Sequence, residues 1–517
     1  MGRINSNVPS LIARNNLDRA GQDLNLRLER LATGLRINRG RDDPAGLIIS
    51  ERLRSEINGV EAGIRNAERA SSVIATTESS LAEVNELLNS IKGLIVESAN
   101  TGANSEEERR ANQLQINSAI DSITRIANTA SFGGLNLLNG DLDYTTSGQV
   151  TSQIARVDVT GATLIDQASL QVTTEVLTSA QTAGIYLSAR SAGFTSAGVI
   201  ENAATLRIRG SLGVTTINIA SSVTFTDLVN TVNNLTTVTG VSASLVNGGA
   251  ASGIVFNSTE YGADEFVSVE RIDDPVGGNP DPFDFLRLAE GQSVPAAAAT
   301  WTGGTFVSAT RDTGRDTQAL INGTVATGDG LNISINTSTL SVSLLLDETF
   351  AITPDGTTTS FDITGGGALF QLGPDVSALQ QSSIGVRSIA SELLGGTLVG
   401  GELNFLSSLK EGQPNDIRNS VSASDFSAAN AIIDQSIDDI TILRGRLGAF
   451  ERNTLQTNVR SLQASFENLS ASSSVIRDAD FALETSALTR AQTLSAASQS
   501  TLALANQQAG SVLQLLG

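Results

Sequence analysis

Apolar residues recur at steps of three and four over the first 35 residues of the chain. This spacing is that of the a and d positions of a coiled coil, where one face of a helix packs on a partner helix. The positions that carry the pattern are Leu17, Gly21, Leu24, Leu28, Leu31 and Leu35. The pattern predicts a first helix, and we expect Gly40 to end it because glycine readily adopts the left-handed conformation that terminates helices.

A second and longer run of the same kind extends from Ile49 to Ile95. Its thirteen steps cover 46 residues, which gives a period near 3.5. Such a period favours a long supercoiled helix over a globular one. Ser71 and Glu78 are polar interruptions of this predicted seam.

Ser105 and Glu108 begin a third predicted helix. They have the spacing of a capping box, in which each side chain accepts a hydrogen bond from the other residue's backbone amide. The apolar seam of this helix is Ile116, Ile120, Ile123 and Ala127. The glycines of SFGGLNLLNG, residues 131–140, are expected to end it.

The last hundred residues repeat the helical pattern. One stripe contains Ile433, Ile437, Ile440, Leu443, Leu447 and Phe450, and after a five-residue step a second contains Leu455, Val459, Leu462, Phe466 and Leu469. A final helix carries Leu483, Ala487, Leu494, Ala497, Thr501 and Leu504. Because both ends of the chain have helices with matching seams, we expect the two ends to pair with each other.

The middle of the chain, residues 141–410, has a different texture, rich in Thr, Ser and Gly. In TLRIRGSLGVTTINIA, residues 205–220, apolar and polar residues alternate on both sides of a Gly-rich turn, which is a hairpin signal. LNISINTSTLSVSLLLD, residues 331–347, repeats the alternation. The predicted fold class is therefore mainly α, with paired coiled-coil terminal regions and an inserted β-rich region of one or two domains.

The stretch RLATGLRINRGRDDPAGLIIS, residues 30–50, interrupts the first two helical runs. Asp43 can cap the second helix, and Pro44 suits its first turn because that position has no intrahelical donor to lose. The charged residues here fix the angle between the helices, bind a neighbouring subunit, or lie in a solvated turn, where ion pairs contribute only about 0–1 kcal/mol. The residues of this predicted joint are Arg36, Arg39, Arg41, Asp42, Asp43 and Pro44.

Composition narrows the possible functions. The 517 residues include no Cys and no His, which excludes disulfides and every site that needs a thiolate or an imidazole. The only lysines are Lys92 and Lys410. We therefore expect no catalysis, no bound metal and no cofactor. No apolar stretch is long enough to span a membrane, and the first residues lack the apolar core of a cleavable secretory signal.

The charge is concentrated in the middle. The chain has 33 basic and 54 acidic residues, and residues 141–410 hold 10 of the basic and 26 of the acidic ones. A net charge of −21 argues against a nucleic acid or an anionic membrane surface as partner. Two nearly neutral ends around an acidic middle suggest that the ends pack against other chains and that the middle faces water.

Several separate stretches resemble bacterial flagellin. They are MGRINSNVPSLIARNNLDRA, the interrupted stretch at residues 30–50, SFGGLNLLNG, RGRLGAFERNTL, IRDADFALETSALTRAQTL and SVLQLLG. The resemblance covers about 140 residues at the front and about 100 at the back. Residues 204–270 resemble a repeat module of flagellins and hook-associated proteins.

The resemblance implies three domains. Residues 1–40 and 475–517 would pair as a coiled coil that lines the central channel of a filament. Residues 41–140 and 411–474 would form a rod-like inner domain, and residues 141–410 would project outward as a β-rich, acidic insertion. The predicted joint would then connect the channel layer with the inner domain.

The expected function is a structural subunit that assembles with copies of itself into the helical flagellar filament. The contacts would come from the seam residues Leu17, Leu24, Leu28, Leu31, Leu35, Leu483, Leu494 and Leu504. The alternative for these leucines is that they belong only to the core of one chain. Alternative functions are a hook–filament junction protein and a filament subunit that also serves as a surface adhesin; a protease insertion, known in some flagellins, would need histidines that this chain lacks.

The resemblance also implies partners and a location. An export chaperone, the filament cap and hook–filament junction proteins would bind the chain, which would leave the cell unfolded through the flagellar type III apparatus and reach the extracellular filament without a cleavable signal. In many flagellins an Arg, a Leu and a Glu bind an innate immune receptor. Here Leu94 is retained, Ser90 replaces the Arg, and Leu114 or Gln115 stands at the Glu position. Loss of such charged contacts predicts weak recognition.

Overall fold

A computed structural model describes most of the chain. The described residues are 7–164, 169–188, 198–249, 253–273, 283–289, 305–337, 339–352, 358–399, 402–423 and 425–516, of which 509–516 are described as helical backbone only. Residues 1–6 of the first flagellin-like stretch and the side chains of SVLQLLG therefore lie outside the described residues.

The chain divides into two compact units. The first contains Met1–Ser71, Gln371–Gln381 and Phe450–Gly517, and the second contains Ser72–Phe370 and Ser382–Ala449. The three domains expected from the sequence follow another division of the chain and stay a prediction.

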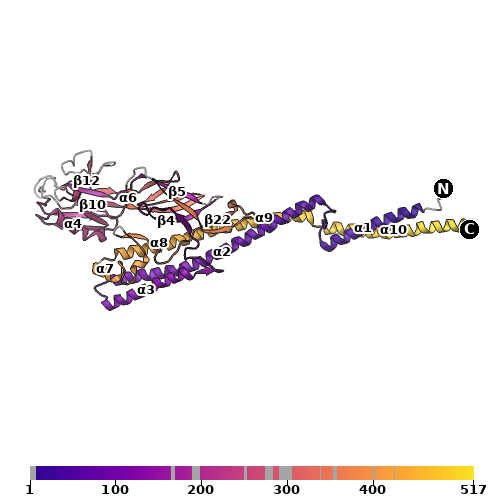
Figure 1. Ribbon diagram of the computed structural model, residues 1–517, viewed down its shortest axis with the longest axis horizontal. Coiled ribbons are helices and arrows are strands. Elements are labelled where there is room, and N and C mark those ends of the chain that lie inside the picture. The colour runs from indigo at the N-terminus through magenta and orange to yellow at the C-terminus, as the bar shows by residue number, and fades with distance from the viewer. Residues whose placement is uncertain are drawn as a thin grey trace. The chain divides into compact units, whose positions relative to one another are not determined.

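The first unit is built from long helices. These are α1 (Val8–Thr33), the first part of α2 (Pro44–Ala99), a π-helical turn at Glu451–Leu455, α9 (Gln456–Arg477) and α10 (Phe481–Leu516). Asn7 caps α1, because its side-chain oxygen accepts a hydrogen bond from the amide of Ser10 at 3.1 Å. In Figure 1, α1 and α10 run side by side.

The first helix ends earlier than expected. Gly34, and not Gly40, takes the left-handed conformation, with φ at 72°, and its amide donates to the carbonyl of Arg30 at 2.9 Å. Leu35 therefore lies outside the helix and forms an isolated antiparallel β-bridge with Asp478. Either Gly34 or Gly40 could have ended the helix. The helix ends at the earlier glycine, where the chain forms the bridge to Asp478.

The five-residue step between Phe450 and Leu455 is a π-helical turn. A π-helix bonds each amide to the carbonyl five residues earlier, so it absorbs one extra residue without breaking the helix. α8 (Ser427–Phe450) ends where this turn begins, and Leu455, the last residue of the turn, and Leu462 on α9 are buried.

A short segment packs on the helices of the first unit. Between strands β21 (Ala368–Gln371) and β22 (Gln381–Ile384), the chain passes close to α2, where a Cβ atom added to Gly59 would lie 2.9 Å from Cβ of Pro374. The side-chain amide of Asn458 on α9 donates to the carbonyl of Leu372 at 2.7 Å. The absence of a side chain at Gly59 allows this close approach.

The helices of the second unit are the rest of α2, α3 (Glu106–Thr129), α7 (Ile417–Ala423) and α8. The predicted capping box of α3 is present, with both hydrogen bonds between Ser105 and Glu108. Both lysines make ion pairs here, Lys92 with Asp434 at 2.5 Å and Lys410 with Asp121 at 2.8 Å. Residues at the predicted seam positions form the core: Ile74, Leu81, Val84, Leu88, Ile91, Ile95, Ile116, Ile120, Ile123, Ile433, Ile440, Leu443 and Leu447.

The remainder of the second unit is β-rich. One core lies between the sheet β13-β12-β6-β10-β9 and the sheet β14-β11-β7-β8 with α4 (Phe225–Asn233); the other lies between the sheets β16-β15-β5-β20-β3 and β17-β18-β19-β4. The strands of the first pair are β6 (Gly184–Ser188), β7 (Ala204–Arg209), β8 (Val214–Ile219), β9 (Val241–Leu245), β10 (Gly253–Ser258), β11 (Phe266–Arg271), β12 (Phe285–Leu288), β13 (Phe306–Ser308) and β14 (Arg311–Thr313). Those of the second pair are β3 (Tyr144–Ser147), β4 (Ile154–Ala162), β5 (Leu170–Thr178), β15 (Gln318–Ile321), β16 (Thr324–Val325), β17 (Thr327–Asp329), β18 (Asn332–Asn336), β19 (Leu340–Leu346) and β20 (Thr358–Gly366).

Smaller elements complete the described chain. They are β1 (Ser131–Phe132), β2 (Leu135–Asn136), β23 (Thr397–Val399), β24 (Glu402–Asn404), α5 (Thr236–Thr239), α6 (Glu348–Ala351) and 3-10 turns at Val246–Gly248, Ala378–Gln380 and Leu406–Leu409. The predicted hairpin at residues 205–220 is present as β7 and β8, in which Leu206 pairs with Ile217. The predicted fold class, helical terminal regions with a β-rich middle, is confirmed.

Candidate functional site

The two terminal helices form an antiparallel pair. Near the start of α1, the side-chain amide of Asn7 donates to the carbonyl of Ala505 at 3.1 Å, and the Ser10 hydroxyl donates to Oδ1 of Asn506 at 2.7 Å. Near its end, Arg27 reaches Glu484 on α10. Because contacts exist at both ends of α1, the two helices have one defined register.

A buried ion cluster fixes this register. The Glu484 side chain is 3% exposed, and its carboxylate lies 3.0 Å from Nη1 of Arg27 and 3.0 Å from Nη1 of Arg30. Burial raises the pKa of the Glu484 carboxyl, but the hydrogen bonds and charges of the two guanidinium groups outweigh that effect and hold the pKa below its usual range. Sequence spacing did not reveal this cluster, because an acidic residue among apolar ones is an ordinary feature of a solvated helix face.

Most of the fully buried positions of α1 and α10 have small side chains. Ala13 is buried on α1, and Ala491, Ser495 and Ala505 are buried on α10. These positions, and not the leucines of the predicted stripe, form the buried face of α10. The predicted stripe is therefore a second face of the same helix.

The predicted seam residues fall into two groups in the single chain. Leu17, Leu24, Leu31 and Leu35 are half-buried. Leu28, Leu483, Leu494 and Leu504 are exposed, at 47, 64, 49 and 58%. Val8, Leu11, Ile12 and Phe481 are exposed on the same two helices. Burying a leucine side chain contributes about 1.5–3 kcal/mol, so the second group leaves a large potential gain unused in one chain.

The predicted joint residues are brought together between α1 and α2. The Arg36 amide donates to the Arg477 carbonyl, and its guanidinium donates to the Ile476 carbonyl, both at 2.7 Å. Oδ2 of Asp42 accepts from the amides of Asn38 and Arg39, and these bonds, that of Arg39 foremost, hold the pKa of the Asp42 carboxyl below its usual range.

The other joint residues also have partners. Arg39 lies 3.0 Å from Glu29, and Arg41 lies 3.8 Å from Asp42. Oδ1 of Asp43 accepts from the amide of Gly46 at 2.9 Å, at the start of α2, whose first residue is Pro44. The segment is therefore an ordered connection, and its role between domains stays a prediction.

The residues aligned with the immune-receptor contact lie on two helices of the second unit. Leu94 is half-buried and Ser90 is exposed on α2, and Leu114 and Gln115 are exposed on α3. No carboxylate or guanidinium stands at the two positions where the resemblance expects one.

A second ion network, which sequence reasoning missed, lies in the second unit. The Asp439 carboxylate on α8 is 2.6 Å from Arg387 and 3.5 Å from Arg156, and both arginines also contact Asp158 on β4, at 3.1 and 2.9 Å. Burial raises the pKa of both carboxyls. The network joins a helix to the β-rich region, and no spacing rule could find it because its members come from three distant parts of the chain.

Within the described ranges, no group of three or more acidic side chains could hold a metal ion. Of the helices described, none is long and apolar enough to cross a membrane.

Comparison with known proteins identifies the family. Residues 4–143 match the bacterial flagellin N-terminal helical region, and residues 431–516 match the bacterial flagellin C-terminal helical region. The flagellin of Salmonella typhimurium is 28% identical over 528 aligned positions, which cover 99% of each chain. Polar flagellin F of Vibrio parahaemolyticus is 43% identical over 137 residues, 26% of this chain and 36% of that protein, so that match spans about a third of the relative's length.

A solved structure gives a weaker likeness. Flagellar hook associated protein-3 of Legionella pneumophila covers 82% of this chain and 97% of its own, with 12% identity and a TM-score of 0.30.

A chain with these two terminal helical regions around a β-rich middle is a structural protein of the flagellum. It belongs to the bacterial flagellins, the subunits of the flagellar filament, and the predicted family and function are confirmed. The matched family is structural, and its place is the flagellar filament.

Proposed function

We propose that this chain assembles with copies of itself through the exposed face of its terminal helix pair. The observation that carries the proposal is the row of exposed leucines on α10, namely Leu483, Leu494 and Leu504. These leucines lie on a neighbouring face of α10, about 100° around the helix from the buried face that packs on α1. A second copy can therefore cover the leucines without disrupting the pair.

Because the buried face of the helix pair is already satisfied within one chain, assembly gains its free energy from the exposed face. Within one chain, Arg27 and Arg30 neutralise Glu484, so the pair presents no uncompensated buried charge to a neighbour. Between chains, each leucine removed from water adds about 1.5–3 kcal/mol. When contacts between different faces of identical subunits do not close into a ring, their repetition gives a helical filament, and we propose contacts of this non-closing kind.

A variant with Leu483, Leu494 and Leu504 changed to serine tests this proposal. We expect the intact chain to form material that sediments with filament seeds, and the variant to stay in the supernatant. The matched control changes three exposed apolar residues of the β-rich region to serine: Leu212, Val214 and Val325, which are exposed at 66, 54 and 66%. Sedimentation of the α10 variant like wild type, or failure of the control, would contradict the proposal.

The same proposal assigns a place in the filament to each part of the chain. The helices of residues 1–40 and 475–517 line the channel, those of 41–140 and 411–474 form the inner rod, and residues 141–410 face outward. The joint from Arg36 to Pro44 connects the first two layers. Residues 1–35 and 480–517 should each be required for pelleting, and continued filament growth by either truncated chain would contradict the assignment.

The partners are other parts of the flagellum. We propose that the chain binds an export chaperone, the filament cap and the hook–filament junction proteins. It leaves the cell by type III export without a cleavable signal. We propose neither a nucleic-acid partner nor insertion into a membrane. We also propose weak recognition by the innate immune receptor, since Ser90 replaces a charged contact and only Leu94 is retained. Strong receptor activation by purified monomer would contradict that expectation.

A further inference from the structure

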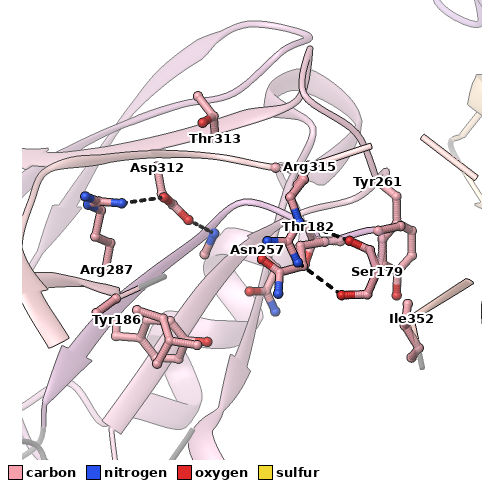
Figure 2. Close-up of a pocket in the computed structure, with 16 residues that line it drawn as sticks. Ser179, Thr182, Tyr186, Asn257, Tyr261, Arg287, Asp312, Thr313, Arg315 and Ile352 are labelled. Carbon is pink, nitrogen blue, oxygen red and sulfur yellow. Dashed lines mark hydrogen bonds and ion pairs between the residues drawn. The ribbon is translucent and has the colours of Figure 1, made fainter. Parts of the chain in front are cut away.

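A polar pocket opens in the β-rich region of the second unit, away from the terminal helices in sequence. Its volume is about 490 Å³, within the range of sites that hold small ligands. Figure 2 shows side chains from β6, β10, β12 and β14 around it, together with Ser179, Thr182, Tyr261 and Arg315 from the connecting segments.

Three side chains converge at Gly184 in this pocket. The amide of Gly184 donates to Oδ2 of Asp312 at 2.9 Å. A Cβ atom added to Gly184 would lie 3.3 Å from Oδ1 of Asn257 and 3.4 Å from Cε2 of Tyr186. A carboxylate, an amide and an aromatic ring thus surround one point where the backbone has no side chain of its own.

The charge of the lining is positive, unlike that of the chain as a whole. The residues that line the pocket include two arginines, Arg287 and Arg315, and one carboxylate, that of Asp312, which lies 4.0 Å from Nη1 of Arg287. Arg315 donates to the carbonyl and the hydroxyl of Ser179, both at 3.1 Å and both uncharged. In a protein of net charge −21, this local excess of guanidinium favours an anionic group on the ligand.

Hydroxyl groups and ring faces are the other features that the lining suits. The side-chain amide of Asn257 makes no hydrogen bond within the described part of the chain, so it can both donate and accept. The Tyr186 ring is held by an edge contact with Phe306, with centroids 5.1 Å apart, and the Tyr261 hydroxyl is held by Glu348 at 2.6 Å. Fixed aromatic rings beside amide and carboxylate groups suit a ligand with an apolar ring face and polar edges.

We propose that this pocket binds an acidic saccharide, a sugar ring with several hydroxyl groups and one carboxylate. Arg287 pairs with the ligand carboxylate, Asn257 and Asp312 bind its hydroxyls, and Tyr186 contacts its ring. Because this site lies outside the terminal helices, binding can be measured on the monomeric full-length chain, whether or not filaments form.

Titration of the full-length protein with D-glucuronate, followed by saturation-transfer NMR and calorimetry, tests the proposal. We expect saturable binding by wild type, at least about tenfold weaker binding by Arg287→Gln and by Asn257→Ala, and at least about tenfold weaker binding of D-glucose. Arg209→Gln removes an exposed guanidinium of β7 that does not line the pocket, and it should bind like wild type.

Each contrary result is decisive. Absence of saturable binding, equal binding by wild type and Arg287→Gln, equal affinity for D-glucose and D-glucuronate, or inorganic phosphate binding as tightly as D-glucuronate would overturn the assignment. Circular dichroism verifies that each variant folds. If Arg287→Gln does not fold, the Asn257→Ala variant still tests the proposal.

Discussion

Glu484 accepts hydrogen bonds from Arg27 across a sequence separation of 457 residues, with 3.0 Å between Oε2 and Nη1. The contact joins the first helix of the chain to the last. Because the carboxylate is almost fully buried, it requires its two arginines, and slippage between α1 and α10 would leave it without them.

The change Glu484→Gln should loosen the terminal helix pair. Glutamine keeps the shape of the side chain but loses the charge that accepts from two guanidinium groups, at a cost of about 1.5–3 kcal/mol. Hydrogen exchange at residues 8–33 and 481–508 should become faster. Asp23→Asn is the control, since Asp23 pairs with Arg27 at 3.2 Å but its side chain is 45% exposed, and it should have little effect. Unchanged exchange in Glu484→Gln would contradict the role of this cluster.

The change Asp143→Asn should stabilise the second unit at neutral pH. Burial raises the pKa of Asp143 from 3.8 to about 6 in the folded chain. Because the pKa of Asp143 is higher in the folded than in the unfolded chain, the protonated carboxyl stabilises the fold relative to the ionised one. This contribution is fully present below about pH 4 and is lost as the pH rises through 6. Asparagine has no charge to bury, so we expect a gain of about 1–3 kcal/mol at pH 7 and almost none at pH 4.

Urea unfolding at both pH values measures this difference. Asp141→Asn is the matched control, because hydrogen bonds from Asn139 and Asn136 lower the pKa of exposed Asp141, and its neutralisation should give no gain at pH 7. The account of Asp143 is wrong if Asp143→Asn gains as much stability at pH 4 as at pH 7.

The change Asp439→Ala should destabilise the second unit strongly. It removes from Arg387 and Arg156 a carboxylate that is 7% exposed and leaves them only Asp158, and breaking a buried pair costs about 3–5 kcal/mol. The neighbouring Asp438 is exposed, so Asp438→Ala should change the unfolding free energy by less than about 1 kcal/mol. Equal urea midpoints for the two variants would show that the network is not structural.

Two glycines of the first unit should respond to alanine in opposite directions. Gly59→Ala places a Cβ atom 2.9 Å from Cβ of Pro374, so the packed segment must shift, at a cost of about 1–3 kcal/mol. Gly21→Ala meets nothing within 4 Å on α1 and should stabilise that helix by up to about 1 kcal/mol. Thermal unfolding of the two variants checks the signs, and destabilisation by Gly21→Ala or stabilisation by Gly59→Ala would contradict the packing described here.

The periodic parts of the fold could be predicted from the sequence. The seam of α2 repeats at 3.5 residues over many turns, so no local competing signal outweighs it, and Leu81, Val84 and Leu88 are fully buried as the pattern requires. The hairpin of β7 and β8 was predictable for the same reason, since alternation and a Gly-rich turn agree with each other.

Contacts between distant segments could not be predicted. The helix end at Gly34 accompanies a bridge between Leu35 and Asp478, and spacing within residues 1–40 contains no trace of it. The face of α10 that packs on α1 could not be predicted either, because the alanines and the serine buried there carry no apolar signature. The ion network of Asp439 depends on three segments whose proximity only the fold creates.

Electron microscopy of the intact purified chain mixed with short filament fragments tests the central claim most directly. The claim is that exposed apolar residues of the paired terminal helices bind further copies of the same chain. We predict that the fragments lengthen as the monomer is consumed, and that the variant with serine at Leu483, Leu494 and Leu504 does not lengthen them. Fragments of constant length in the presence of folded, intact monomer would contradict the claim.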